Sequence, residues 1–382
     1  MNSVLFVIPG LKTGGTNSSL SSIYNCVRKQ FDIKVFSIAH QPTILGYSFD
    51  SVIMKQNLLL SLFFSDYADQ RGILKALAFF VKCIQSFFRL FGLNIGLLYG
   101  KRVVKKMESD NDFDCIVAFQ EGYTTHFVSM FHNPNKYAWI HCNYNTYLPV
   151  NLSEESLYNS FSKIVCVSKY TASLFAERYP SLKDKILAIY NFLDLQKIQS
   201  LSQQPISDDR FLTNKPVIIS VGRFSKVKRF TEIPRIAASL VEKGLKFYWY
   251  VIGPEEDSSV VHLFKKNLSQ YRMQDSVIWL GGKTNPYPFF RSADVYVCLS
   301  QSEACPMVFK EAMFFNLPIV TTDFPSAFEF INNSNGIIAP FEDIDNAIIQ
   351  IIHKKGPKTT NNINQYEDLE AVSTIIELLS NL

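Results

Sequence analysis

The sequence predicts an α/β protein with two domains, each built on a parallel sheet. Short apolar segments of strand length alternate with longer helical or polar segments, a pattern typical of a parallel sheet with helices on both faces. This alternation runs twice, on either side of a polar segment at 196–216. With 382 residues, 47% hydrophobic and 19% charged, the chain is long enough for two cores and too apolar for a disordered protein.

The first series starts with an apolar strand at 4–8, which leads into the Gly-rich turn PGLKTGGTNSS and a helix near 20–28. Further strands are expected at 33–38, 115–120, 136–141, 163–168 and 185–191. The second series predicts strands at 217–222, 247–253, 276–281, 295–300 and 318–323, with a last helix at 365–379. Because 196–216 is rich in Ser, Gln, Asp and Pro, we expect a linker there between domains at 1–195 and 217–382.

Charge and cysteine usage exclude several classes of protein. Residues 1–190 contain 19 Lys and Arg against 13 Asp and Glu, whereas residues 191–382 contain 19 against 21. The basic half favours an anionic surface as its neighbour, but no nucleic-acid motif is present, so no nucleic-acid partner is expected. Seven cysteines without a Cys-x-x-Cys pair indicate reduced thiols. We find no signal peptide before the first strand and expect a cytoplasmic protein.

The segment 58–98 departs from the strand–helix alternation and reads as an amphipathic insertion. Lys75, Lys82 and Arg89 interrupt its apolar residues every seven positions, so a membrane-spanning helix is not expected. Seven residues are nearly two helical turns, which places these charges on one face. The pattern from 72 to 98 predicts a helix with a basic face and a Phe/Leu/Ile face, suited to an anionic membrane interface. The alternative is a core helix whose basic face meets water.

The strongest chemical signal is SQSEACPMVFKEAMFFNLPIVTTD, residues 300–323. It places Glu303 in a loop after a strand and Glu311 on the following helix. Pro306 is expected in the first helical turn, so that the amides of 307–310 and the helix dipole face an anion. Ligands of parallel sheets bind at the carboxyl ends of strands, where Glu303 is expected. Taken alone, two glutamates at this spacing also describe a solvated face.

A second signal is VGRFSKVKRF, residues 221–230. A strand ends in Gly222, and Arg223 and Lys228 follow in the next loop. Two cations on one loop can bind a diphosphate, Arg through its planar guanidinium and Lys as a point charge. The same pair without its context describes an ordinary solvated turn.

Together these two segments resemble the large family of retaining glycosyltransferases of the GT-B fold, in which two Rossmann-like domains face each other across a cleft. Glu303 and Glu311 match its Glu-x7-Glu donor motif, and Gly222, Arg223 and Lys228 match its Gly-Arg…Lys loop. The resemblance implies that Arg223 and Lys228 hold the diphosphate. It implies that Glu311 binds the ribose hydroxyls and that Glu303 contacts the donor sugar. The acceptor would bind the N-terminal domain and the donor the C-terminal domain.

The resemblance extends further along the chain. His141, in WIHCNYN, would reach the donor sugar and join Glu303, Arg223 and Lys228 as the catalytic group. Further donor-binding residues implied by the resemblance are Gly14, Gly15, Gly253, Leu280, Cys305, Pro306, Met307 and Val308. The chain departs from the family at 304–306, where Ala-Cys-Pro replaces the usual Gly-rich loop, so the identity of the donor sugar stays open.

The resemblance implies transfer of a hexose or N-acetylhexosamine from a nucleotide diphosphate sugar to a glycan or lipid-linked acceptor in surface polysaccharide biosynthesis. Neither a metal nor another cofactor is expected, because cations and a helix N-terminus already stabilise the leaving diphosphate. The Asp-x-Asp spacings at 110–114 and 343–345 are interpreted as solvated turns. The alternatives are a non-catalytic partner subunit, a nucleotide-sugar epimerase, and a soluble protein as acceptor. The expected location is cytoplasmic and peripheral on the inner membrane face.

Overall fold

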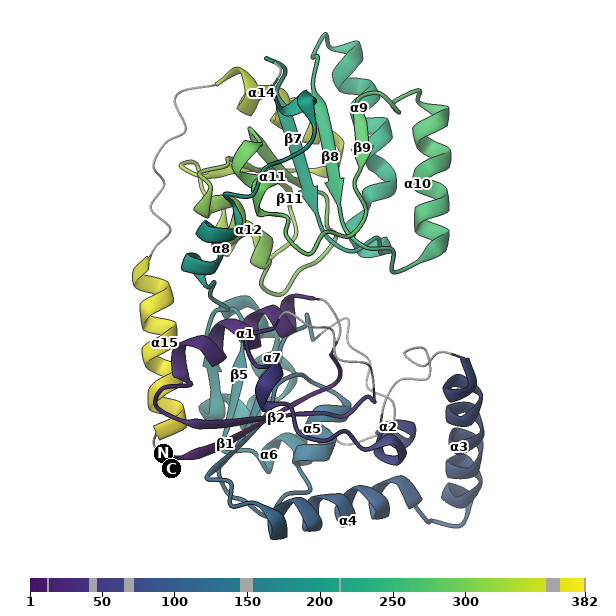
Figure 1. Cartoon of the computed structure of the whole chain (residues 1–382), viewed down its shortest axis with the longest axis vertical. Coiled ribbons are helices and arrows are strands. Elements are labelled where there is room, and N and C mark those ends of the chain that lie inside the picture. The colour runs from purple at the N-terminus through teal and green to yellow at the C-terminus, as the bar shows by residue number, and fades with distance from the viewer. Residues whose placement is uncertain are drawn as a thin grey trace. The chain divides into compact units, whose positions relative to one another are not determined.

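A computed structural model describes residues 1–11, 14–40, 47–64, 72–144, 154–212, 214–354 and 365–380 (Figure 1). The chain divides into two compact units, Met1–Phe192 with Tyr366–Leu382, and Leu193–Gln365. Each unit contains one six-stranded sheet in which every pairing is parallel. The predicted α/β fold class is therefore confirmed.

Unit 1 has the strand order β2-β1-β3-β4-β5-β6. Its strands are β1 (Ser3–Ile8), β2 (Asp32–Ser37), β3 (Cys115–Ala118), β4 (Lys136–Ile140), β5 (Lys163–Cys166) and β6 (Ile186–Ala188). Its helices include α1 (Gly15–Val27), α5 (Tyr123–Val128), α6 (Glu154–Asn159), α7 (Lys169–Arg178) and α15 (Gln365–Ser380). All six strands fall in predicted segments, because β-branched and aromatic residues fill a sheet that is buried on both faces.

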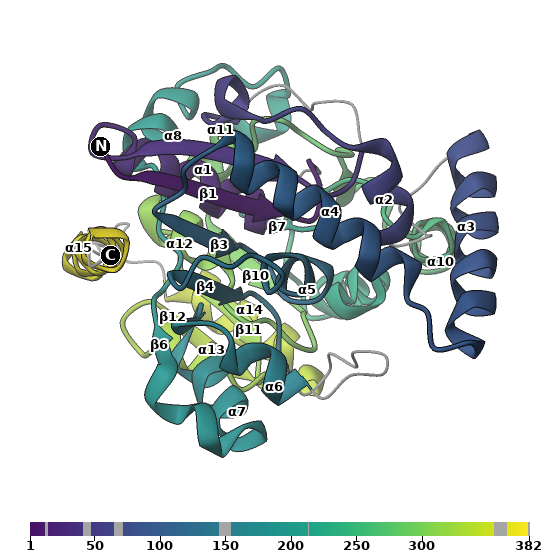
Figure 2. The ribbon, with the colours of Figure 1, turned by 90° about the horizontal axis from the view of Figure 1, so that it is seen from below.

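An insertion between β2 and β3 forms α2 (Leu58–Phe64), α3 (Gly72–Leu90) and α4 (Ile95–Asp110). The prediction of one helix from 72 to 98 is wrong in extent, because the chain turns after Leu90. Gly92 adopts φ +73°, which glycine tolerates without strain, and the Asn94 side chain caps α4 by accepting the Leu97 amide at 3.0 Å. Figure 2 shows α3 at the outer edge of unit 1, away from the sheet.

Unit 2 has the strand order β12-β11-β10-β7-β8-β9. Its strands are β7 (Val217–Val221), β8 (Tyr248–Ile252), β9 (Val277–Trp279), β10 (Val295–Cys298), β11 (Ile319–Thr322) and β12 (Gly336–Ala339). Its helices are α8 (Leu195–Leu201), α9 (Ile233–Glu242), α10 (Ser258–Gln270), α11 (Tyr287–Ser292), α12 (Met307–Phe314), α13 (Ala327–Phe330) and α14 (Ile344–His353). Strands β7 to β11 were predicted, whereas the four-residue edge strand β12 was not.

Each face of the unit 2 sheet carries its own hydrophobic core. Neighbouring residues of a strand point to opposite faces, so Ile218 packs toward α9, α10 and α14, while Ile219 packs toward α11, α12 and α13. Strand order reverses between β7 and β10, since the chain adds β8 and β9 on one side and β10 to β12 on the other. In such sheets the crevice for a ligand lies at the carboxyl ends of the strands beside this reversal.

The unit boundary lies elsewhere than the expected linker at 196–216. Most of that segment is ordered in unit 2, because α8 packs on α11 and the Asn285 side chain donates to the Leu201 carbonyl at 2.9 Å. Helix α15, which we expected within the domain 217–382, belongs to unit 1. There Tyr137 Oη donates to the Leu378 carbonyl at 2.9 Å.

Candidate functional site

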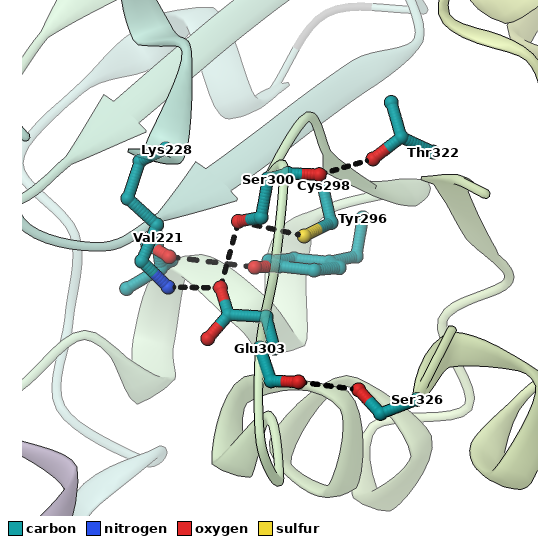
Figure 3. Close-up of polar contacts among 8 residues, drawn as sticks. All are labelled: Val221, Lys228, Tyr296, Cys298, Ser300, Glu303, Thr322 and Ser326. Carbon is teal, nitrogen blue, oxygen red and sulfur yellow. Dashed lines mark hydrogen bonds and ion pairs between the residues drawn. The ribbon is translucent and has the colours of Figure 1, made fainter. Parts of the chain in front are cut away.

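Lys228 and Glu303 meet at the carboxyl ends of β7 and β10 (Figure 3). Lys228 lies in the short 3-10 helix Lys226–Lys228 that follows β7, and Glu303 lies in the loop that follows β10. Lys228 Nζ and Glu303 Oε1 form an ion pair whose side chains are only 18% and 16% exposed. The strand-order reversal thus brings together two residues that are 75 positions apart in the sequence.

Hydrogen bonds from neighbouring strand ends hold Glu303 in place. Ser300 Oγ donates to Glu303 Oε1 at 2.7 Å, and Ser326 Oγ donates to the Glu303 carbonyl at 2.6 Å. Thr322 Oγ1 in turn donates to the Ser300 carbonyl at 2.5 Å (Figure 3). Sequence reasoning missed these three hydroxyls. The available signal was weak, namely a small polar residue at the end of one apolar strand, Thr322, and two others shortly after strand ends, Ser300 and Ser326.

Lys228 is held as a cation. Burial is the largest single effect and lowers its pKa, but the charge of Glu303, the hydrogen bond to Glu303 and the nearby Cys298 together offset burial, and the net pKa is raised. The lysine side chain passes close to Gly222, where a Cβ would lie 3.3 Å from Phe230 Cζ and 3.4 Å from Lys228 Cδ and Cε. The side chain therefore crosses the end of β7 over a residue without a side chain.

Arg223, the other predicted cation, pairs with a different carboxylate. Its guanidinium forms an ion pair with Glu256, and 55% of its side chain is exposed. The positive charge of Arg223 still reaches Lys228, whose pKa it lowers slightly. The two predicted cations of the loop after β7 therefore each pair with a different carboxylate, and sequence reasoning had not anticipated Glu256.

Backbone segments at the ends of β7, β8 and β9 pack directly on one another. The Gly253 amide donates to the Gly281 carbonyl at 2.9 Å, and Trp279 Nε1 donates to the Gly253 carbonyl at 3.1 Å. A Cβ on Gly253 would lie 1.6 Å from the Gly222 carbonyl oxygen, so no other residue fits without displacement. Leu280 packs into the core on the α11–α13 face. Gly253 thus lies directly against Gly222 and the Arg223 amide at the start of the loop.

The loop from Glu303 to α12 departs from the sequence prediction at its proline. Pro306 precedes the helix as its N-cap residue, and α12 begins at Met307 rather than at the proline. The Phe309 amide bonds to the Pro306 carbonyl at 2.9 Å. Because the first amides of a helix have no partner within it, those of Met307 and Val308 are the ones that can meet an anion. Cys305, in the same loop, is partly exposed.

Glu311 lies on α12 beside Tyr287 of α11. Tyr287 Oη donates to Glu311 Oε1 at 3.3 Å, a contact that sequence reasoning missed. Burial raises the pKa of Glu311 to about 7, although the tyrosine hydrogen bond opposes the rise. Near neutral pH the Glu311 carboxyl is present in both its protonated and its ionised form. It can therefore donate a hydrogen bond to a hydroxyl ligand or accept one from it.

Glu311→Gln is expected to change the pH dependence of stability. The folded-state pKa of about 7 exceeds the ordinary 4.5, so the folded protein binds the extra proton between these values and loses stability as pH rises. Glutamine removes this loss. The free energy of unfolding of the variant minus that of the wild type should therefore rise by up to about 3 kcal/mol between pH 4.5 and pH 7.5. Chemical denaturation at each pH measures this difference. The matched variant Glu242→Gln, on the exposed side of α9, should show no such rise with pH. An equal rise in both variants would contradict the conclusion that burial raises the pKa of Glu311.

Unit 1 holds the remaining predicted residues. His141 follows β4, and its Nε2 is buried with no hydrogen-bond partner in the part of the chain that the structure describes. Burial lowers the pKa of His141 to about 3, so the imidazole is neutral. The His141 amide donates to Glu121 Oε2 at 2.8 Å, and sequence reasoning missed Glu121. Gly14 and Gly15 begin α1, where a Cβ on Gly14 would meet no described atom within 4 Å.

Comparison with known proteins assigns the segment that contains this site to a family. Residues 203–368 match the sequence profile of the family described as glycosyl transferases group 1. Residues 203–368 therefore belong to the group 1 glycosyltransferase family. The matched segment contains the Lys228–Glu303 pair, Gly253 and Glu311.

Relatives with similar sequences cover different shares of this chain. The O-antigen biosynthesis glycosyltransferase WbnH of Escherichia coli is 24% identical over 348 residues, which is 90% of this chain and 88% of WbnH. An uncharacterized glycosyltransferase of Methanocaldococcus jannaschii is 24% identical over 174 residues, 45% of this chain and 42% of that relative, so the match spans less than half of its length. Among solved structures, Anabaena HepE in complex with UDP and glucose is similar with a TM-score of 0.72 and 18% identity, covering 100% of both chains. This likeness shows that the fold is GT-B.

Proposed function

We propose that the chain transfers a hexose or N-acetylhexosamine from a nucleotide diphosphate sugar to a glycan or lipid-linked acceptor, with retention at the anomeric carbon, in surface polysaccharide biosynthesis. The observation that carries this proposal is the largely buried Lys228–Glu303 pair at the strand-order reversal, within the segment that matches the group 1 profile. The name of WbnH, an O-antigen biosynthesis enzyme, supports the polysaccharide context. The UDP and glucose bound by HepE support a nucleotide-sugar donor.

The cations of unit 2 have the chemistry to stabilise a leaving diphosphate. As the bond from the anomeric carbon to the phosphate oxygen breaks, its electron pair leaves with the diphosphate, and a new bond forms to the acceptor oxygen. The added negative charge meets Lys228, Arg223 and the first amides of α12. The proton of the acceptor hydroxyl passes to the departing phosphate oxygen, so no protein base is required.

Other residues orient the donor in this proposal. Glu303, fixed by Ser300, accepts a hydrogen bond from a sugar hydroxyl, and Glu311 binds the ribose hydroxyls. The Nε2 atom of His141 is buried and has no hydrogen-bond partner among the described residues. A sugar hydroxyl would supply that partner. Gly14 and Gly15 let the backbone approach the donor phosphates, and Gly253 keeps the end of β8 against Gly222 at the base of the Arg223 loop. The segment 305–308 brings the amides of Met307 and Val308 to the ligand.

We propose that catalysis needs no metal, because Lys228, Arg223 and the α12 amides provide the positive charge that a metal would otherwise supply. Assays with UDP-, GDP- and ADP-sugars should show release of one nucleotide, and this release should persist in EDTA. Loss of activity in EDTA that Mg²⁺ restores would contradict this part of the proposal.

The same assay separates the competing functions when Glu303→Gln and Arg223→Ala run beside the wild type. Transfer predicts nucleotide release that depends on acceptor and falls in both variants. An epimerase would convert the donor sugar without any acceptor. A folded wild-type protein that neither releases nucleotide nor gains thermal stability from any donor would favour a non-catalytic partner subunit.

A further inference from the structure

Exposed apolar side chains concentrate at the corner formed by α3 and α4. Among the described residues, nine of the eighteen exposed large hydrophobic side chains lie between 77 and 98. They are Leu77, Phe79, Phe80, Phe87, Leu90, Phe91, Leu93, Leu97 and Leu98. An apolar patch of this kind is uncommon on a monomeric protein and marks a surface that something else covers.

Helix α3 has the opposite orientation to an ordinary surface helix, because polar residues face unit 1 and most of its apolar residues face solvent. Its inner face carries Ala78, Lys82 and Gln85, while most of its Phe and Leu side chains are exposed, namely Leu77, Phe79, Phe80, Phe87 and Leu90. Lys82 Nζ donates to the Phe63 carbonyl at 2.9 Å, and a Cβ on Gly96 of α4 would lie 2.3 Å from Gln85 Nε2. The hydrogen bond of Lys82 and the close packing of Gln85 on Gly96 therefore hold the helix with its apolar face outward.

This orientation corrects our expectation for the basic face. We expected Lys75, Lys82 and Arg89 to meet an anionic surface together. Lys82 instead faces inward, 5.2 Å from the centre of the Tyr123 ring, because its face of the helix packs on unit 1. Lys75 and Arg89, near the two ends of α3, remain exposed.

Cations flank the apolar corner along α4. Its exposed face begins with Leu97 and Leu98 and continues at helical spacing with four exposed cations, Lys101, Arg102, Lys105 and Lys106. Residues 72–110 contain seven Lys and Arg but only two acidic residues, Glu108 and Asp110. An apolar tip beside a cationic flank complements the acyl boundary and the phosphates of an anionic lipid surface.

The two helices have a geometry suited to lying in a membrane surface. Among the described residues, no single helix is long and apolar enough to cross a bilayer. Leu74–Leu90 and Ile95–Asp110 pass that test only as a pair, and the chain bends by 106° between them. Figure 1 shows these two helices meeting at the outer edge of unit 1.

We propose that the α3–α4 corner docks unit 1 on an anionic lipid bilayer. The side chains of Phe80, Phe87 and Phe91 enter the interface, and the cations of α4 contact lipid phosphates. The proposal concerns a surface of unit 1 alone and does not depend on the transfer reaction proposed above, although docking would bring the chain to a lipid-linked acceptor.

Co-sedimentation with vesicles tests the proposal on the full chain. We compare vesicles of phosphatidylcholine alone with vesicles that also contain phosphatidylglycerol. The wild type should bind the anionic vesicles at least about tenfold more tightly. Phe80→Ser/Phe87→Ser/Phe91→Ser should lose binding to both kinds of vesicle, and Lys101→Glu/Lys105→Glu should lose at least about tenfold on anionic vesicles.

Matched controls in unit 2 distinguish binding through the α3–α4 corner from nonspecific hydrophobic or electrostatic binding to vesicles. Phe328→Ser/Leu263→Ser removes two other exposed apolar side chains, and Lys266→Glu/Lys354→Glu makes the same change of charge. Both should bind as the wild type does. Vesicle binding that the triple Phe variant retains, or no binding by the wild type, would overturn the proposal. So would a wild-type dimer in solution that the triple Phe variant converts to monomer, since a second copy would then cover the corner.

Discussion

Lys228→Met is expected to lower the rate of sugar transfer by about 10²–10³-fold at saturating donor, the usual effect of removing one group that stabilises a leaving charge. The lysine is held as a cation by Glu303 and lies at the strand ends where the ligand crevice is expected. The rate is measured as nucleotide release with acceptor present. Lys226→Met is the matched control, because Lys226 is an exposed cation in the same short helix, and its rate should stay near that of the wild type.

A second variant separates catalysis from folding. Lys228→Met alone leaves the Glu303 carboxylate largely buried without its cation, and this should cost about 3 kcal/mol of stability. Lys228→Met/Glu303→Gln removes both charges and should recover most of that stability while its activity stays low. A double variant that regains both stability and activity would show that the pair only supports the fold.

Gly253→Ala is expected to destabilise unit 2 by about 3 kcal/mol or more and to abolish nucleotide binding. The new Cβ would lie 1.6 Å from the Gly222 carbonyl oxygen, which is backbone and cannot rotate away. The ends of β7 and β8 must therefore separate, and the loop that carries Arg223 and Lys228 moves with β7. Thermal unfolding and nucleotide titration on the same sample measure the two effects.

Gly244→Ala provides the comparison for this variant. Gly244 has φ +85° but open space around its Cα, so alanine there adds only the backbone strain of a left-handed residue, about 1–2 kcal/mol. It should leave nucleotide binding intact. If Gly253→Ala is no more destabilising than Gly244→Ala, the close approach of Gly253 to Gly222 does not constrain the site.

Local patterns carried enough information for eleven of the twelve strands in the described part of the chain. Strands buried on both faces are continuous apolar segments, such as VLFVI in β1, and need no partner to be recognised. The edge strand β12 is only GIIA and follows an Asn-rich turn, so its length and composition did not distinguish it from a loop. The insertion was recognised, but its break at Gly92 was not, because apolar residues continue on both sides of the glycine.

The sequence by itself determined the α/β class, the family resemblance and the residue types of the donor site, since these depend on short contiguous segments. Only the tertiary structure decided which groups meet. Lys228 meets Glu303 because β7 and β10 are neighbours in the sheet, although 73 residues lie between the end of β7 at Val221 and the start of β10 at Val295. Arg223 pairs with Glu256 instead. Packing also decided that α3 turns Lys82 inward and its phenylalanines outward. Helical periodicity defines two faces, but only the neighbouring helices determine which one is buried.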